Sequence, residues 1–410
     1  MIIWVICLDP RILYVNSNIV SNILSKGDFM KQRLMFITIF IIQFIIAMEM
    51  NFIGPLAPFF SNYFDIKASQ VVYFNLGYSL VGIFVPIFGV WADRFGNKKL
   101  ISYSLFLFLI GTLISGFAPS ALVFLLGRIL IGLGYFSLSG TMMSYVSEFV
   151  DYKNRGKASG ILRTAFGFAI FASPIYTAIL TTRFANLQSI YLPISILAVV
   201  ALLLLTKLPE TELIEDSKLN IEEFLSILKN PSTIKVLISL FLIITAPATL
   251  YNFLSIHLST EFGLTQGQIG LTYSTFAIGT MLGILTATFL ADKYGKLTFA
   301  RVFFTIMIIG LLPIAYVKSV AIAIMLTFMF AFGLDGGWTA YQAFASEIYP
   351  KKRSTFMSLF YTVNAAVITV YSLLGPFLYD LGGLRLTTGV GFISSLIALI
   401  ILFRLSRIPV

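Results

Sequence analysis

The chain has 410 residues, of which 58% are hydrophobic and only 11% are charged, whereas soluble domains carry about 25% charged residues. This composition excludes an ordinary soluble protein and leaves room for about 12 membrane spans of ~20 residues each. The formal charge is +10, and the single cysteine and single histidine exclude an internal disulfide and metal sites built from several Cys or His side chains.

Apolar runs follow one another from Leu34 almost to the C-terminal end and are separated by short polar turns. Each run is long enough to cross a bilayer as a helix. The predicted fold class is therefore an all-α polytopic membrane protein with twelve transmembrane helices. The expected spans are 34–59, 69–91, 100–117, 120–144, 157–180, 189–206, 233–256, 268–290, 300–317, 320–343, 355–379 and 384–405.

The spans divide the chain into four parts. Residues 1–32 form an N-terminal tail, which we interpret as disordered or as an extension upstream of a functional start at Met30 or Met35. Residues 33–206 and 233–410 form two six-helix bundles, and residues 207–232 link them. The linker contains an apolar pattern at helical spacing that predicts an amphipathic helix on the membrane surface, formed by Ile221, Phe224, Leu225 and Leu228.

The positive charges predict the orientation of the chain in the membrane. With the N-terminus placed in the cytoplasm, 22 of the 28 Lys and Arg residues lie in cytoplasmic segments and four in outside loops. Both termini and the linker are therefore expected in the cytoplasm of a multi-pass plasma-membrane protein. This distribution explains the high net charge without a nucleic-acid partner. We expect a monomer surrounded by the lipid bilayer.

The two halves repeat one another at a fixed offset of 199 residues. Identical residues occupy both positions at Ala92 and Ala291, Asp93 and Asp292, Gly96 and Gly295, Gly134 and Gly333, Ser147 and Ser346, and Glu148 and Glu347. An ungapped register over this length predicts two pseudo-symmetric six-helix halves that arose by duplication. Such repeats are typical of secondary transporters, whose substrate sites lie near the membrane midplane between the repeats.

Three motifs resemble those of the major facilitator superfamily, and the resemblance covers nearly all of residues 33–406. The loop from Gly89 to Lys99 is similar to the family signature G-x-x-x-D-R-x-G-R-K/R-K/R, with Asn97 in place of one basic residue. Arg128-x-x-x-Gly132-x-Gly134 is similar to a pattern associated with proton-coupled members. The antiporter pattern of span 5 is degraded, because Ser173-Pro174 stands where that pattern has Gly-Pro.

The signature loop implies a conformational latch at the cytoplasmic ends of the spans. Asp93 can cap a neighbouring helix or pair with a basic residue, and such contacts would hold the two halves in one state. The alternative is a solvated turn that only sets the topology. The expected latch residues are Gly89, Asp93, Arg94, Gly96, Lys98, Glu148, Arg155, Asp292, Glu347 and Arg353.

Four ionisable residues inside spans are candidates for proton or substrate coupling, because charges at this depth are costly. Glu49 lies about 24 Å into span 1 and Arg128 about 12 Å into span 4 from the outside, so the two can share a level. Glu49 could then load and release a proton or bind a cation. Arg163 and Asp335 both fall in the cytoplasmic half and could pair across the two halves. A static buried ion pair and local packing are the alternatives.

Aromatic residues near the expected cavity are weaker candidates for substrate contact, among them Phe52, Tyr78 and Tyr251. The resemblance implies alternating access without a cofactor, driven by a proton gradient. We expect proton-coupled efflux of a drug-like or metabolite molecule, and the alternative is proton-linked uptake of a small organic anion or sugar. A sensor or receptor with a transporter fold is a remote alternative. No catalytic or metal-site pattern indicates an enzyme.

Overall fold

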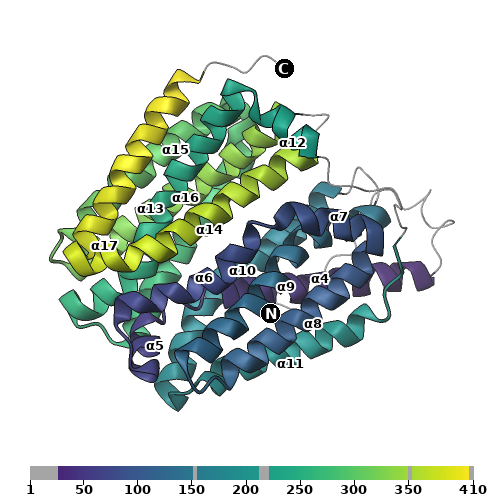
Figure 1. Ribbon diagram of the computed structural model, residues 1–410, viewed down its shortest axis with the longest axis horizontal. Coiled ribbons are helices and arrows are strands. Elements are labelled where there is room, and N and C mark those ends of the chain that lie inside the picture. The colour runs from purple at the N-terminus through teal and green to yellow at the C-terminus, as the bar shows by residue number, and fades with distance from the viewer. Residues whose placement is uncertain (1–25, 151–154, 212–220, 350–352, 406–410) are drawn as a thin grey trace.

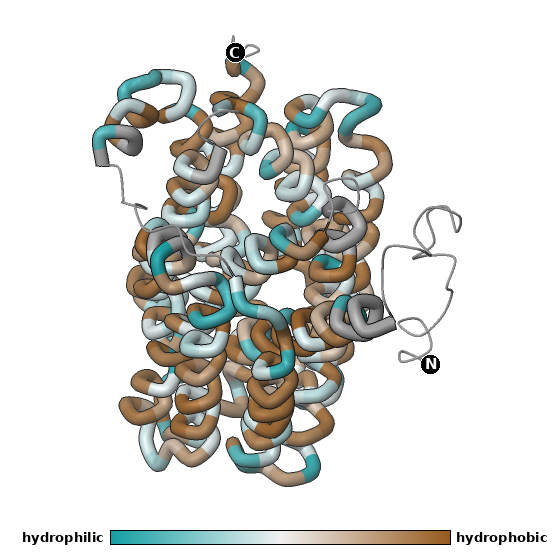
Figure 2. The backbone as a smooth tube through the Cα atoms, turned by 90° about the vertical axis from the view of Figure 1, so that its right-hand side faces the viewer, coloured by the Kyte–Doolittle hydropathy of each residue, from teal (hydrophilic) through white to brown (hydrophobic). Residues whose placement is uncertain are grey.

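The computed structural model describes residues 26–150, 155–211, 221–349 and 353–405, together with most of their side chains. Every regular element in these residues is a helix, and ten helices are long and apolar enough to cross a membrane. The predicted all-α membrane fold is thus confirmed. Figure 2 shows mostly hydrophobic helices with hydrophilic segments at turns.

The helices up to residue 205 gather into one group, here called the N-terminal bundle (Figure 1). Its members are α4 (Lys26–Met50), α5 (Ala57–Phe64), the short 3₁₀ helix η1 (Ala68–Tyr73), α6 (Phe74–Gly82), α7 (Val85–Phe95), α8 (Asn97–Gly116), α9 (Ala121–Phe149), α10 (Arg155–Phe184) and α11 (Leu187–Leu205).

The later helices form a second group, the C-terminal bundle (Figure 1). Its members are α13 (Pro231–Phe262), α14 (Gln266–Tyr294), α15 (Lys296–Leu311), η3 (Leu312–Ala315), α16 (Val320–Ile348) and α17 (Arg353–Arg404). Non-helical backbone at Gly382 and Gly383 interrupts α17. The predicted linker helix is present as α12 (Ile221–Leu228).

We name the two ends of the bundles by the linker that joins them. The linker side carries the C-terminal ends of α7, α9, α14 and α16 and the described ends of the linker, and the far side carries the opposite ends of these helices.

The outer surface of α14 shows how the fold meets lipid. Large apolar side chains on this helix are exposed at helical spacing, which places them on one face. They are Leu271, Ile278, Leu282, Leu285 and Phe289, the last with 76% of its surface exposed. A continuous apolar face of this kind suits a bilayer and would be a liability in water.

The first predicted span is interrupted rather than continuous. The α4 helix ends at Met50, and regular helix resumes only at Ala57. Between them lie Gly54 and Pro55, and a Cβ on Gly54 would stand 2.6 Å from the Tyr251 ring and 3.0 Å from the Tyr251 carbonyl oxygen. Pro55 lacks a backbone N–H donor, and the absence of a side chain on Gly54 permits the close approach of α13. Hydropathy alone does not reveal this break.

The 199-residue register reappears in the geometry of both bundles. Gly96 and Gly295 have the same positive φ of 86°, and each joins two antiparallel helices. Positive φ at this position favours glycine in both repeats. Asn97 donates to Glu148 in one bundle, and Lys296 donates to Glu347 at the corresponding place in the other. The pseudo-symmetric pairs therefore join equivalent helices.

Small residues let the helices of each bundle pack closely. A Cβ on Gly134 of α9 would lie 2.7 Å from the Ser104 carbonyl oxygen of α8. In the other bundle a Cβ on Gly333 would lie 2.6 Å from the carbonyl oxygen of Phe303, which is the residue 199 positions after Ser104. Backbones in contact at such positions are typical of membrane helix pairs.

Gly134→Ala is therefore expected to destabilise the protein by about 1–3 kcal/mol, because the backbones of α8 and α9 must separate. Gly140→Ala, on the same helix, is the matched control, since a Cβ there would meet no atom of the described structure within 4 Å. Thermal unfolding of the purified variants in one detergent measures the difference. Equal midpoints for the two variants would contradict the close packing.

Candidate functional site

A fully buried ion pair lies at the end of α4. Glu49 occupies the last turn of α4, and its Oε1 accepts a hydrogen bond from Nη1 of Arg128 on α9. The two side chains are 0% and 1% exposed. Tyr191 of α11 donates its hydroxyl to the same carboxylate oxygen at 3.4 Å. The proximity expected from helix rise is thus present, and the pair and its tyrosine come from three helices, α4, α9 and α11.

Arg128 has two further contacts that hold it in place. Its Nε donates to the Phe74 carbonyl oxygen at 3.4 Å, and its guanidinium lies 5.1 Å from the centre of the Tyr78 ring. The second carboxylate oxygen of Glu49 and Nη2 of Arg128 are buried and have no hydrogen-bond partner in the described part of the chain. Since an incompletely satisfied buried pair is a poor source of stability, its presence favours a functional role.

The interrupted segment after Glu49 connects the two bundles on the far side. The Ser255 hydroxyl of α13 donates to the Gly54 carbonyl oxygen at 2.5 Å, and the Gln266 amide of α14 donates to the Pro55 carbonyl oxygen at 2.9 Å. The Tyr251 hydroxyl donates to Oδ1 of Asn51 at 3.1 Å. Carbonyls freed by the break are thereby satisfied by the opposite bundle. Glu49 lies next to this junction in the chain, so a change in its charge would occur beside the contacts that join the two bundles.

A second polar contact strengthens the far-side junction. Asn75 of α6 donates its amide to Oδ1 of Asn252 on α13 at 3.0 Å, and both side chains are buried. Thr369 of α17 donates to the Ser79 hydroxyl at 2.9 Å. These neutral groups join the bundles without a net charge.

Arg163 joins the bundles nearer the linker side. It is exposed, and its Nη2 donates to Oε1 of Gln342 on α16 at 3.2 Å. The Gln342 amide donates in turn to the Tyr361 hydroxyl on α17. Arg163 lies eight residues into α10, about 12 Å from its start. An exposed charge at that depth marks a position between the bundles that solvent can reach.

Asp335 is held by a different partner from the one we considered. The Thr280 hydroxyl of α14 donates to Oδ2 of Asp335 at 2.6 Å. An Arg163–Asp335 ion pair is absent from the described residues, so this expected pairing is wrong for this conformation. The reason is the seven-residue separation of Asp335 and Gln342 on α16, which is about 10 Å along the axis. Arg163 reaches Gln342, which lies nearer the linker side than Asp335.

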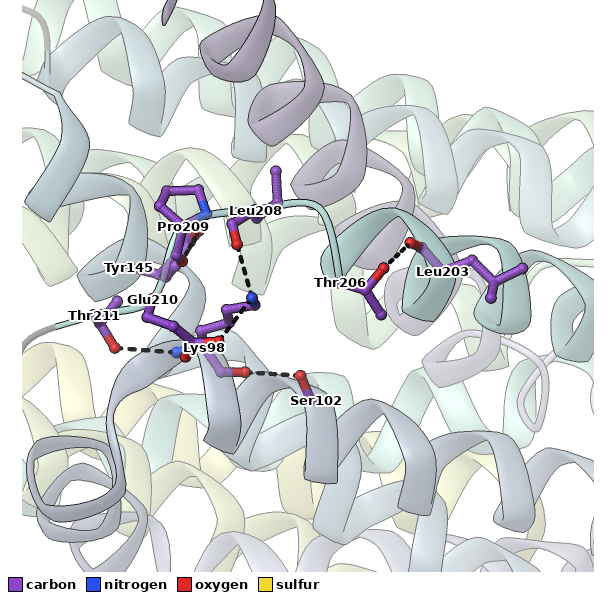
Figure 3. Close-up of polar contacts among 9 residues, drawn as sticks. All are labelled: Lys98, Ser102, Tyr145, Leu203, Thr206, Leu208, Pro209, Glu210 and Thr211. Atoms are coloured by element: carbon purple, nitrogen blue, oxygen red, sulfur yellow. Dashed lines mark hydrogen bonds and ion pairs between the residues drawn. The ribbon is translucent and has the colours of Figure 1, made fainter.

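The signature loop contacts the beginning of the linker. Nζ of Lys98 donates to the Leu208 carbonyl oxygen at 2.7 Å and pairs with Glu210 at 2.9 Å. The Tyr145 hydroxyl donates to the Pro209 carbonyl oxygen at 2.9 Å. Figure 3 shows Lys98 and Tyr145 converging on this short segment. Part of the stretch that we interpreted only as a linker is therefore a binding partner of the loop.

Three further latch candidates, Glu148, Asp292 and Glu347, contact partners within their own bundle. Lys296 pairs with Asp292 at 3.1 Å and also with Glu347. Glu148 accepts from Asn97, and Arg94 is exposed. For the other latch candidates, Gly89, Asp93, Arg155 and Arg353, the structure describes only the helical backbone. A latch between bundles stays a prediction.

The three aromatic candidates lie in different surroundings. Phe52 is fully buried and packs against the Tyr176 and Tyr191 rings. Tyr78 contacts the guanidinium of Arg128, and Tyr251 belongs to the far-side junction. A far-side pocket of about 250 Å³ is lined by other residues, including Pro58, Asn62, Thr181, Ser259 and Gln266.

Sequence reasoning did not identify the neutral partners at these sites. Gln342, Thr280, Tyr191 and Asn252 all contact a candidate or join the bundles. An amide inside a predicted span is the one available signal, since it must find a hydrogen-bond partner there. The sequence contains many Thr and Tyr, so neither type singles out a partner, and Thr hydroxyls often bond the backbone of their own helix, as Thr249 does.

The sequence matches the family profile described as Major Facilitator Superfamily over residues 39–256 and 236–410. An uncharacterized MFS-type transporter of Bacillus subtilis, YceJ, is 25% identical over 83% of this chain and 88% of that protein. Multidrug resistance protein 2 of the same organism is 27% identical over 36% of this chain, and the match spans only 38% of that relative.

The fold has a close counterpart among solved structures. The structure of a bacterial homolog of the human lysosomal transporter Spinster, described as inward-facing and unoccupied, superimposes with a TM-score of 0.75. The match covers 94% of this chain and 98% of that protein at 16% identity. At this identity the similarity concerns the fold alone.

Proposed function

The chain belongs to the Major Facilitator Superfamily of membrane transporters, and we propose that it exports a drug-like or metabolite molecule in exchange for protons by alternating access. The observation that carries the proposal is the buried Glu49–Arg128 pair beside the break in the first span. Proton gain by Glu49 removes its negative charge and weakens its attraction to Arg128. The freed guanidinium then favours a different arrangement of α4 and α9.

The proposal includes twelve spans in two six-helix halves. The interruption at Gly382 and Gly383 divides α17 into two spans. The broken helix from η1 through α7 supplies one more span, because its pieces together cover residues 68–95. We assign the linker side, and with it both termini, to the cytoplasm of a plasma-membrane protein because that side carries most of the positive charge. The working unit is a monomer.

The contacts between the bundles support an inward-open state. On the far side, hydrogen bonds from Ser255, Gln266 and Asn75 join the bundles. Toward the linker side, Arg163 and Tyr361 are exposed at membrane depth. The opposite state requires the far-side bonds to break and the linker-side ends to close. Lys98, Glu148, Lys296 and Glu347 lie where a latch would act in that state.

The second candidate is proton-linked uptake of a small organic anion. The exposed guanidinium of Arg163 favours it, because a cation that solvent reaches at this depth suits an anionic group.

Purified protein in liposomes with an imposed pH gradient tests both candidates, with ethidium as a drug-like probe, benzoate as an anion and a trapped pH dye. Exchange predicts that ethidium accumulates on the side that protons leave, and that nigericin abolishes the accumulation. Symport predicts that benzoate accumulates on the side that protons enter. Equal probe flux with and without the gradient, and no proton movement when probe is added, would refute proton coupling.

A further inference from the structure

Two opposite charges lie near one another between the bundles without forming an ion pair. Arg163 of α10 is exposed and uses one of its N–H groups to bind Gln342. Asp335 of α16 is half-buried, and Oδ2 accepts from Thr280. Both side chains retain hydrogen-bonding capacity beyond these contacts, because a guanidinium has five donors and a carboxylate about four acceptor sites.

The separation of the two charges is set by α16. Gln342 marks the level of the guanidinium, and Asp335 lies seven residues further from the linker side, about 10 Å along the helix. Tyr361 completes the polar row through its bond to Gln342, and the half-buried Trp338 lies on α16 between Asp335 and Gln342 in sequence. A ligand lying along α16 would thus meet an acid, an aromatic region and a base in order.

Charge complementarity distinguishes the classes of ligand that could lie there. A cation gains attraction from Asp335 but is repelled by Arg163, and an anion meets the reverse. A molecule with an amine at one end and an acidic group at the other satisfies both charges at once. At membrane depth these interactions are screened less than at the protein surface. The buried ion pair of Glu49 and Arg128 is neutral as a whole and adds no net preference.

We propose that this transporter selects amphoteric substrates, with an amine bound at Asp335 and an acidic group bound at Arg163 across an apolar body. The proposal rests on the transport function proposed above and names its substrate class. It assigns Asp335 and Arg163 to specificity, and it leaves the proton step to Glu49.

A matched series on one rigid scaffold tests the proposal. The probes are 4′-(aminomethyl)biphenyl-4-carboxylic acid, its methyl ester, its N-acetyl derivative and the compound blocked at both ends. Binding to the purified full-length protein is measured in detergent without a gradient. The amphoteric acid is expected to bind at least about tenfold more tightly than either singly charged derivative. Asp335→Asn should remove its advantage over the N-acetyl compound, and Arg163→Gln its advantage over the ester.

Arg183→Gln is the control, because Arg183 is an exposed arginine at the far end of the same helix, α10. It should retain both preferences. Equal affinity for all four probes, no binding by any of them, or unchanged preferences in both Asp335→Asn and Arg163→Gln would overturn the proposal. Because binding is read without a proton gradient, these results are independent of the proton-coupling test. A transporter driven by pH that shows no amphoteric preference would refute the substrate class alone.

Discussion

Glu49→Gln is expected to abolish transport driven by a pH gradient while leaving exchange of substrate without a gradient. The amide keeps a carbonyl oxygen for Nη1 of Arg128, but it cannot take up and release a proton. The substrate-binding groups proposed on α10 and α16 are not altered. Reconstituted protein with ethidium inside and outside measures both reactions, with accumulation under the gradient and label exchange in its absence.

Glu261→Gln provides the control for this experiment, since Glu261 is an exposed acid near the end of α13. It should accumulate probe at the wild-type rate. If the Glu49→Gln protein accumulates probe with the wild-type rate and pH dependence, Glu49 does not carry the proton.

The strongest sequence features predicted both geometry and contacts. Charges are rare in spans, so Glu49 and Arg128 stood out, and helix rise alone placed them at one level. The positive φ at Gly96 fits the sequence as well, because a glycine within a charged loop between two long apolar runs can adopt it readily. The offset of 199 residues predicted its partner at Gly295.

The rest depends on helix rotation and on neutral partners. The packing of α10 against α16 decides whether Arg163 faces Asp335 or Gln342. These two residues lie about two helical turns apart on α16. The break after Met50 coincides with Gly54 and Pro55, but its contacts with α13 join segments about 200 residues apart, and no local pattern predicts them. Glu210 lies within the predicted linker, and only the fold brings it to Lys98.

Arg128→Met is expected to destabilise the protein by about 3–5 kcal/mol, because it leaves the buried Glu49 carboxylate without its charge partner. The Tyr191 hydroxyl at 3.4 Å is a weak replacement. Methionine fills part of the space and keeps the apolar contact with Tyr78, so the loss reflects charge more than volume. Thermal unfolding in a single detergent measures the effect.

The double variant Glu49→Gln with Arg128→Met separates stability from function. Removing both charges eliminates the uncompensated ion, so the double variant should be more stable than Arg128→Met alone and close to the wild-type protein. Its gradient-driven transport should nevertheless remain absent, because no proton carrier is left at this site. A double variant as unstable as Arg128→Met would show that the arginine acts through its contacts with Phe74 and Tyr78 instead of through the pair. Restored stability with restored transport would exclude the pair from coupling.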